Sequence, residues 1–545
     1  MRDSHSEFRS DSQPIAWVLR VLVALGILAL LYYYSWWSDP GRITSPWRVL
    51  MLTLTFAYCT VQLVGNWLLY LFARRRQSHP QAPDGLTVDV FVTAYREPVD
   101  LVARSLSAAC RMRYPHKTWL LDDGHDPQLA ALARKLGTGY ITRNDRTDAK
   151  AGNINAALER TDGEIIVIFD ADHAPHADFL EHTLGYFSDP KIGFVQVMLT
   201  FRYRAGSWVA RAASETSLDY YNPTSLGADA VGGSTLVGSN ALIRRSTLES
   251  IDGYQSGLAE DLATSIAIHA KGWRSVYVAE PLAPGMAPPD LTAWFTQQLK
   301  WARGVFELLL TAYPRFFRYL TWGQRVAYAV RMTYYWVGLV VCMHLVFSIW
   351  LLVHGSEKAW DSFQRYLLHL APLGLCYLLI RTVALSNFKH PLVYAGLLWR
   401  AIALVYATWP IYTLAAMMAV FRMPLGFRLT PKTAGGKLNK LWILPQSIAL
   451  LLLGGGVLYG LVTGEDDFPS LFLSFLLVQS LPMLALLVWA LRPANNYAIP
   501  VDLLMEVPPI ETECAVEELI EIGVISPVNV KKSEMVGTVK VGRKE

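Results

Sequence analysis

Apolar segments long enough to cross a membrane constrain the fold of this chain more than any other feature. Two of them precede residue 85, at residues 14–37 and 47–73, and five more follow residue 325. About 20 consecutive apolar residues suffice for a helix to span a bilayer. Because 52% of the 545 residues are hydrophobic and only 17% are charged, the composition is typical of a membrane protein that also carries a sizeable soluble part.

Positive charges orient these segments. Three arginines, Arg74 to Arg76, directly follow the second segment, and such clusters favour the cytoplasmic side. If all five later segments crossed, the lysine-rich stretch 432–440 would lie outside, against this tendency. We therefore predict that residues 392–421, which contain Arg400 and Pro410, lie in the membrane interface. Six spans remain, with both termini inside; the later four are residues 328–353, 366–384, 441–462 and 471–491.

Between residues 85 and 285 short apolar runs alternate with amphipathic helical patterns. Strands are expected at residues 88–93 and 118–121, and helices at residues 99–111 and 127–135. Strand and helix in alternation predict a mostly parallel sheet covered by helices. This part is expected to be soluble and to face the cytoplasm.

The run Ile165-Ile-Val-Ile-Phe169 predicts a strand buried on both faces, and it ends in two carboxylates, Asp170 and Asp172. Surface turns carry many such pairs, but ligands of open α/β sheets gather where strands end. Two carboxylates there can hold a divalent cation that binds a diphosphate. The pair therefore predicts a nucleotide site.

Other polar residues follow the neighbouring strands. Tyr95 and Glu97 come after the first strand, where a base can stack and form hydrogen bonds. The acids Asp122 and Asp123 come after the second. A helix cap or a turn is the alternative explanation for each of these signals alone.

Two helix starts carry further charges. Lys150-Ala-Gly-Asn153 is expected to precede a helix, where a lysine and helix-end amides can meet phosphate. Glu260 and Asp261 open the helical pattern 262–271, and stabilisation of the helix dipole would explain them equally well.

A last signal lies on the amphipathic pattern 291–313. Its apolar stripe faces away from Lys300, Arg303 and Glu307, and such a helix favours the membrane interface. The motif Gln297-x-x-Lys300-Trp301 lies at the edge of the stripe, where ordinary packing is the alternative.

The series Asp123, Asp170/Asp172, Asp261 and Gln297-x-x-Lys300-Trp301 resembles the D, DxD, TED and QxxRW motifs of processive family-2 glycosyltransferases, most closely cellulose synthase catalytic subunits. The resemblance runs over residues 88–301. Farther on, Phe427-Arg-Leu-Thr430-Pro-Lys432 is similar to the gating loop FxVTxK of that family. The resemblance implies a multi-span α-helical membrane protein with an inserted cytosolic α/β domain of the Rossmann-like GT-A type.

The expected domain plan has five parts. They are an N-terminal region with two transmembrane helices (1–84), a cytosolic GT-A glycosyltransferase domain (85–289), an interface helix with QxxKW (290–323), a membrane channel region (324–491) with about four transmembrane helices, an interface segment at 392–421 and a gating loop at 422–440, and a cytosolic tail (492–545).

The resemblance also implies a role for each matching position. Tyr95, Glu97 and Asp123 would hold the uridine, Lys150 and Asp170 the diphosphate region, and Asp170 and Asp172 an Mg²⁺ or Mn²⁺ ion. Asp261 would be the general base, with Glu260 beside it in the catalytic set; Lys300 would help the leaving group; Gln297 and Trp301 would position the sugars, with Ser239 and Arg303 as further substrate contacts; and Phe427, Thr430 and Lys432 would close over the nucleotide.

The implied reaction is processive and inverting. Glucose from UDP-glucose would extend a β-glucan, either β-1,4 or mixed β-1,3/1,4, that crosses the bacterial inner (plasma) membrane. The expected partners are the growing glucan and the lipid bilayer, with room for a periplasmic or regulatory subunit; a net charge of +4 makes no case for nucleic acid. A β-1,3-glucan synthase and a non-processive lipid-linked sugar transferase are the alternatives.

The chain departs from the family pattern in three places. Ala259 stands for the threonine of TED, Lys300 for the arginine of QxxRW, and Leu236-Val-Gly-Ser239 for Phe-Cys-Gly-Ser. Lysine keeps the charge but not the planar fork that binds phosphate, and the third change leaves the linkage open. Aromatics of the later spans, such as Trp336, Trp409 and Tyr412, either line a sugar track or pack and anchor the helices.

Overall fold

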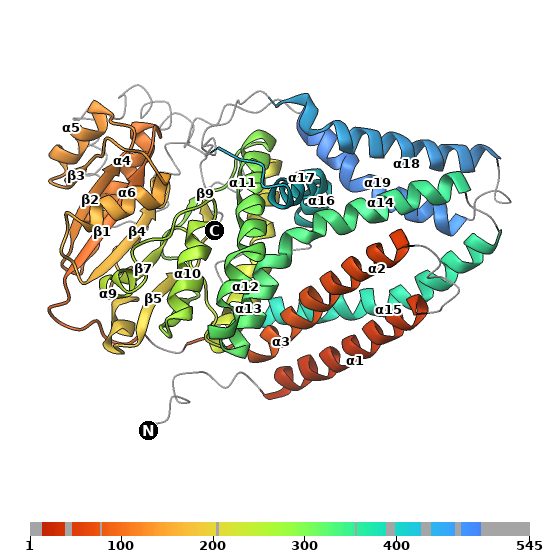
Figure 1. Cartoon of the computed structure of the whole chain (residues 1–545), viewed down its shortest axis with the longest axis horizontal. Helices are drawn as coiled ribbons and strands as arrows, with labels where there is room; N and C mark the ends of the chain where they lie inside the picture. The colour runs from red at the N-terminus through yellow and green to blue at the C-terminus, as the bar shows by residue number, and fades with distance from the viewer. Residues whose placement is uncertain are drawn as a thin grey trace, which may run out of the picture.

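The computed structural model describes residues 13–38, 46–76, 79–202, 207–354, 357–388, 398–426, 438–463 and 470–491. A sheet with its covering helices lies at one end, and long helices lie at the other (Figure 1). Helices α11, α12 and α13 lie between the two. Residues 427–437 and the tail from residue 492 are outside the described residues, so the predicted gating loop, with Phe427, Thr430 and Lys432, is not described.

The main sheet has seven described strands in the order β3-β2-β1-β4-β7-β5-β8. All neighbours pair in parallel except β7, which runs antiparallel to β4 and β5. The prediction of a mostly parallel sheet is therefore confirmed. The strands are β1 Val88–Ala94, β2 Lys117–Asp122, β3 Gly139–Ile141, β4 Ile165–Asp170, β5 Ile192–Val197, β7 Ala241–Arg244 and β8 Arg274–Val278, with a separate pair β6 Phe201–Arg202 and β9 Gly285–Met286.

The central strand β4 is buried on both faces, as its sequence predicts. Successive side chains of a strand point to opposite faces. Ile165, Val167 and Phe169 join the core that includes α4 (Val99–Cys110) and α5 (Pro127–Lys135). Ile166 and Ile168 join a second core, which includes α6 (Ala149–Leu158) and α10 (Glu260–Ala270). Shorter helices complete this part: α7 Trp208–Thr216, α8 Ser225–Ala230 and α9 Arg245–Glu249, with η3 Leu184–Ser188 and η4 Tyr220–Thr224.

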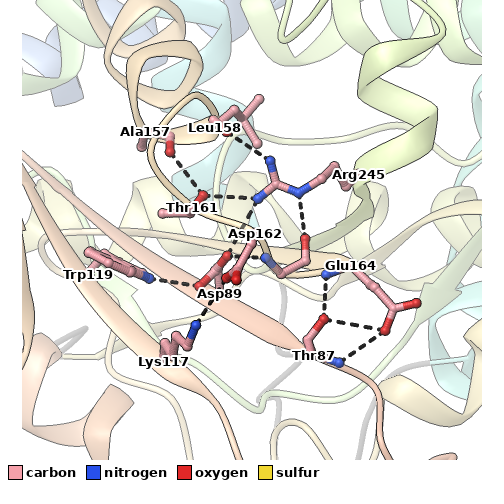
Figure 2. Close-up of polar contacts among 11 residues, drawn as sticks. Thr87, Asp89, Lys117, Trp119, Ala157, Leu158, Thr161, Asp162, Glu164 and Arg245 are labelled. Atoms are coloured by element: carbon pink, nitrogen blue, oxygen red, sulfur yellow. Dashed lines mark hydrogen bonds and ion pairs between the residues drawn. The ribbon is translucent and has the colours of Figure 1, made fainter.

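The amino-terminal end of the sheet is closed by a polar network around Asp89 (Figure 2). This carboxylate, with 0% of its side chain exposed, accepts hydrogen bonds from Trp119 Nε1 at 2.8 Å and Gly163 N at 2.6 Å and pairs with Arg245 at 3.5 Å. Arg245 in turn donates to the carbonyls of Gly163 and Leu158 at 2.6 and 2.9 Å. A buried charge is tolerated when it is paired and hydrogen-bonded in this way.

The membrane part agrees with the predicted spans. Six described helical runs are long and apolar enough to cross a bilayer, at residues 16–37, 49–72, 322–353, 363–388, 444–463 and 472–490. The segment expected in the interface forms two helices, α16 and α17, with a 45° bend between them. The helices are α1 Gln13–Trp37, α2 Pro46–Cys59, η2 Thr60–Val64, α3 Gly65–Phe72, α11 Leu291–Leu310, α12 Ala312–Phe316, η5 Phe317–Tyr319, α13 Trp322–Thr333, η6 Tyr334–Trp336, α14 Val337–His354, α15 Glu357–Phe388, α16 Trp399–Ala407, α17 Trp409–Val420, η7 Lys440–Trp442, α18 Leu444–Thr463 and α19 Ser470–Leu491.

Polar contacts fix α11 against the bent pair. Trp294 Nε1 donates to Thr408 Oγ1, and the Tyr412 hydroxyl donates to Gln298 Oε1, each at 2.9 Å. Tyr412 is fully buried in this contact. The helix that carries Gln297, Lys300 and Trp301 is therefore held firmly between the sheet and the membrane helices.

Candidate active site

Three parallel strands end side by side and bring the predicted residues to one edge of the sheet. Thr93 of β1 is in register with Asp170 of β4, and Ala94 is in register with Asp122 of β2. The next residue, Asp123, donates its backbone N–H to the carbonyl of Ala94 at 3.0 Å. Asp123, Asp170 and Tyr95, which directly follows Ala94, therefore lie at the same edge of the sheet, as the sequence predicts.

Asp170 and Asp172 lie with His173 in one cluster, in which one ligand atom from each residue lies within 4.8 Å of the others. Asp172 and His173 are each 5% exposed. Among the described residues, neither ring nitrogen of His173 makes a hydrogen bond, although Nδ1 lies 3.6 Å from Asp172 Oδ1. A buried imidazole beside two carboxylates suits a divalent cation, so these residues fit the expected metal. His173 was not among the residues predicted for the site.

Lys150 lies inside the first turn of α6, not before the helix, because the helix begins at Ala149. Its ammonium group donates to Asp170 Oδ1 and, at 2.6 Å, to the carbonyl of Gly238. Burial alone would lower the pKa of Lys150, but the negative charges of Asp170 and Glu260 outweigh it, and the pKa is raised. Lys150 therefore stays positively charged beside the acidic pair.

Asp123 forms a forked ion pair with Arg143, with Nε and Nη2 each 2.8 Å from one carboxylate oxygen. The side chains are 9% and 7% exposed for Arg143 and Asp123. Arg143 lies just after β3, the strand beside β2, so only the pairing of strands brings it to Asp123. No sequence motif indicated this arginine.

Tyr95 lies between cationic side chains. The guanidinium carbons of Arg96 and Arg146 are 5.3 and 5.8 Å from the centre of its ring. The backbone N–H of Tyr95 donates to the carboxylate of Glu97, and Arg96 between them has a φ of +62°. This tight turn presents the ring at the strand end, where a base can stack on it.

Helix α10 begins at the two predicted acids. Asp261 Oδ1 accepts a hydrogen bond from Leu262 N at 2.7 Å, while the carboxylate lines a large cavity. Burial raises the pKa of Asp261, and the positive charge of Arg331 opposes this shift only in part. Burial and the neighbouring Asp261 likewise raise the pKa of Glu260. A carboxylate with a raised pKa is a stronger base.

The loop before β7 lies beside both Asp170 and Asp261. Ser239 Oγ accepts a hydrogen bond from Asp170 N at 3.0 Å, and Gly238 has a φ of +89°, which favours glycine. A Cβ atom at Gly238 would lie 3.7 Å from Asp261 Oδ2. Adjacent residues of this loop, Gly238 and Ser239, therefore lie beside Asp261 and Asp170 respectively.

A close approach of two helices brings α11 to α10. A Cβ atom at Gly304 would lie 2.7 Å from Ala259 N and 2.9 Å from Ala259 Cβ. Only glycine fits at such a contact. The backbone of α11 therefore packs directly on the residue that precedes Glu260, and Gln297, Lys300 and Trp301 reach the same cavity as Asp261.

Arg303 shares one face of α11 with Glu307, as predicted, but it is buried and does not reach the cavity. It is 7% exposed and donates to Glu307 Oε2 at 2.7 Å and to the carbonyl of Met423 at 3.3 Å. It is also absent from the residues that line the cavity in the described chain. The contact with Met423 brings the chain after α17 to this side chain.

One cavity of about 960 Å³ unites the site. Asp172, Asp261 and Trp301 all line it, and Trp301 is 39% exposed. The same cavity continues between the membrane helices, where its aromatic lining comes from Tyr58, Tyr70, Tyr334, Tyr335, Tyr377 and Tyr406. Trp336, Trp409 and Tyr412, considered from the sequence as a sugar track, do not line it, so packing is their role in the described structure.

The mixed sheet, the acidic cluster at its edge and the flanking apolar helices define a membrane-embedded glycosyltransferase fold of the GT-A type. Residues 83–304 match the model of the glycosyltransferase-like family 2, and residues 249–388 match the cellulose synthase model. The two matches overlap at residues 249–304 and together run from residue 83 to residue 388. The predicted resemblance to this family is confirmed.

Curated relatives agree with these matches. The chain is 29% identical over 452 residues to a UDP-forming cellulose synthase catalytic subunit of Pseudomonas fluorescens, covering 79% of this chain and 60% of that protein. It is 29% identical over 472 residues to cellulose synthase 1 of Komagataeibacter xylinus, covering 81% and 29%. The chain therefore spans less than two thirds of the length of these relatives. A mannosyltransferase from Pyrobaculum calidifontis in complex with GDP-mannose and Mn²⁺ is 18% identical, with a TM-score of 0.49 over 69% of this chain and 99% of that one.

Proposed function

We propose that this protein is a processive, inverting β-glucan synthase. It transfers glucose from UDP-glucose to the end of a growing β-glucan, of the β-1,4 or mixed β-1,3/1,4 type, and passes the polymer across the bacterial inner membrane. The observation that carries the proposal is the single cavity that Asp172, Asp261 and Trp301 share and that continues between the membrane helices. A transferase that released each sugar into solution would not need such a continuation.

The nucleotide sits at the strand ends. Tyr95 stacks on the uracil, while Glu97 and Asp123 bind the uridine through hydrogen bonds. Asp123 reaches the nucleoside from its pair with Arg143, which fixes the carboxylate in one orientation. Lys150 offsets the negative charge of the diphosphate.

Asp170 and Asp172 would hold a divalent cation, Mg²⁺ or Mn²⁺. His173 lies in the same cluster. Oxygen ligands from carboxylates are what these cations prefer. When bound, the cation supplies positive charge next to the departing diphosphate.

Transfer is a displacement at the anomeric carbon. Asp261 removes the proton of the acceptor hydroxyl as the new glycosidic bond forms, and the bond from the sugar to UDP breaks on the opposite face. Lys300 stabilises the charge that develops on UDP, and Trp301 gives the acceptor sugar an apolar surface to stack on. An α-linked donor thereby yields a β-linkage. General-base assistance of this kind is worth about 10²–10⁴ in rate.

The polymer leaves through the membrane side of the cavity. Tyrosines and charged groups line this part, including Arg331, Arg381 and Asp219. Hydroxyl-rich chains bind through aromatic faces and hydrogen bonds, both of which this lining offers. The catalytic domain then faces the cytoplasm, where UDP-glucose is present.

The proposal is tested with the full-length protein in vesicles, supplied with each UDP-sugar in turn and Mg²⁺ or Mn²⁺. We expect UDP release and long β-glucan with UDP-glucose, and loss of both on chelation, restored by adding the cation. Linkage analysis separates β-1,4 from mixed and β-1,3 products, the last of which would replace the proposed linkage. Single-sugar products on lipid would instead identify a non-processive transferase and overturn processivity.

A further inference from the structure

A second group of metal-ligating side chains lies outside the sugar cavity. His79 comes from the segment between α3 and β1, His182 from the segment between β4 and β5, and Glu280 from the segment between β8 and β9. All three are half-buried, with 27–32% of each side chain exposed. None of them lines the cavity of the active site. The cluster thus joins the chain that leaves the second membrane helix to the catalytic sheet.

The ligand atoms converge on one carboxylate. His79 Nε2 lies 2.7 Å from Glu280 Oε1, and His182 Nδ1 lies 2.9 Å from Glu280 Oε2. The two imidazole rings stack with their centres 4.4 Å apart and their planes at 16°. One nitrogen of each ring is therefore directed at one oxygen of the same carboxylate.

The opposite ring nitrogens also have partners. His182 Nε2 lies 3.9 Å from Asp178 Oδ2, one helical turn earlier, and His79 Nδ1 lies 3.5 Å from the Tyr186 hydroxyl. A histidine that binds a metal almost always offers its second nitrogen to a carboxylate or another polar group, which fixes the ring. Tyr186 has this position for His79, whereas Asp178 lies beyond hydrogen-bond distance of His182.

We propose that His79, His182 and Glu280 bind a divalent transition-metal ion of the Zn²⁺ class. Two imidazoles and one carboxylate suit Zn²⁺, whereas Mg²⁺ and Ca²⁺ prefer oxygen ligands. Three protein ligands leave one tetrahedral position for water.

To admit the ion, the two half-exposed rings must tilt out of their stack so that both nitrogens point to one place. Ligand atoms about 2.0–2.1 Å from a tetrahedral zinc lie about 3.3 Å apart, so the two nitrogen–oxygen contacts widen by about 0.5 Å. Each imidazole binds through a nitrogen that has lost its proton.

The bound ion acts as a clamp and takes no part in sugar transfer. It ties the segment after the second membrane helix to two loops of the catalytic sheet. A ligand that binds only the folded chain stabilises it, so zinc is expected to raise the thermal midpoint of the full-length protein.

The test is zinc binding by the chelator-stripped full-length protein in lipid nanodiscs. Equilibrium dialysis against Zn²⁺, with Mg²⁺ in excess to occupy the carboxylate site at Asp170 and Asp172, is followed by elemental analysis. We expect one retained zinc ion per chain. His182→Ala and Glu280→Gln should lose it, and zinc should no longer raise their thermal midpoints.

Matched variants keep the outcome clear. His116, whose ring nitrogens contact only backbone carbonyls, serves as the histidine control, and His116→Gln should retain zinc. Asp172→Asn should retain it as well. Absence of a retained ion in the wild type, or full retention in His182→Ala and Glu280→Gln, would overturn the proposal, as would loss in Asp172→Asn alone.

Discussion

The two ends of the catalytic sheet carry acids in opposite situations. At the amino-terminal end, Asp89 is fully enclosed and accepts hydrogen bonds from Trp119 and Gly163 beside its pair with Arg245 (Figure 2). At the carboxyl end, Asp261 accepts one hydrogen bond from the Leu262 backbone and lines the cavity. The difference shows how one sheet separates stability from chemistry: a carboxylate surrounded by donors fixes the fold, and one that faces a cavity remains able to take a proton.

The largest effect is expected from Asp261→Asn. The amide keeps the shape but cannot accept the acceptor proton, so UDP release should fall by about 10²–10⁴, measured with a coupled assay on purified protein. Asp252→Asn is the control, because Asp252 is exposed and has a φ of +61°, which asparagine tolerates. Near-normal turnover in Asp261→Asn would remove the assigned base and, with it, the proposed mechanism.

Asp89→Ala tests the other end. Removing one partner of a buried ion pair costs about 3–5 kcal/mol, so the thermal midpoint should fall strongly while UDP release per folded molecule stays the same. Lys117→Ala is the control from the same region, since its pair with Asp162 is exposed to solvent and contributes little to stability. A large loss of turnover in folded Asp89→Ala would contradict the separation of the two ends.

Trp119→Phe should have a smaller effect of the same kind. It keeps an aromatic ring but removes the donor to Asp89, and a hydrogen bond to a charged group is worth about 1.5–3 kcal/mol. Comparing the thermal unfolding of Trp119→Phe with that of Asp89→Ala measures how much of the stability lost in Asp89→Ala comes from this hydrogen bond. Because both changes touch one network, the double variant should lose less than the sum of the two losses.

The smallest effect is a displacement of the pH profile. Asp261 acts as a base only when ionised, and burial raises its pKa. Activity should therefore be present above this raised pKa and should fall, on acidification, at a higher pH than an ordinary aspartate would give. The dependence of kcat/KM on pH measures this limb, which should disappear from the residual activity of Asp261→Asn. If activity instead fell at the pH expected for an ordinary aspartate, water would have to solvate the carboxylate of Asp261.

Much of this arrangement follows from local patterns. The strand 165–170, the acids after it and the helix that begins at Glu260 were predicted because burial and helix starts leave signals within a few residues. The six spans were predicted because the bilayer requires long apolar helices. The motif spacing then pointed to the family.

Contacts between distant segments left no such signal. Arg143 reaches Asp123 only through the pairing of β3 with β2, and Arg303 meets Met423 only because the chain after α17 returns to α11. His79, His182 and Glu280 come from three separate segments, and no spacing between them marks a site.

By itself the sequence determined which residues end strands, open helices and cross the membrane, because hydrophobic periodicity and backbone capping act over short stretches of chain. The tertiary structure decided which of the acids are enclosed and which face the cavity. The donors that surround Asp89 and the helices that line the cavity around Asp261 come from distant segments. A carboxylate's role depends on those neighbours, so only the folded chain separates the structural acid from the reactive one.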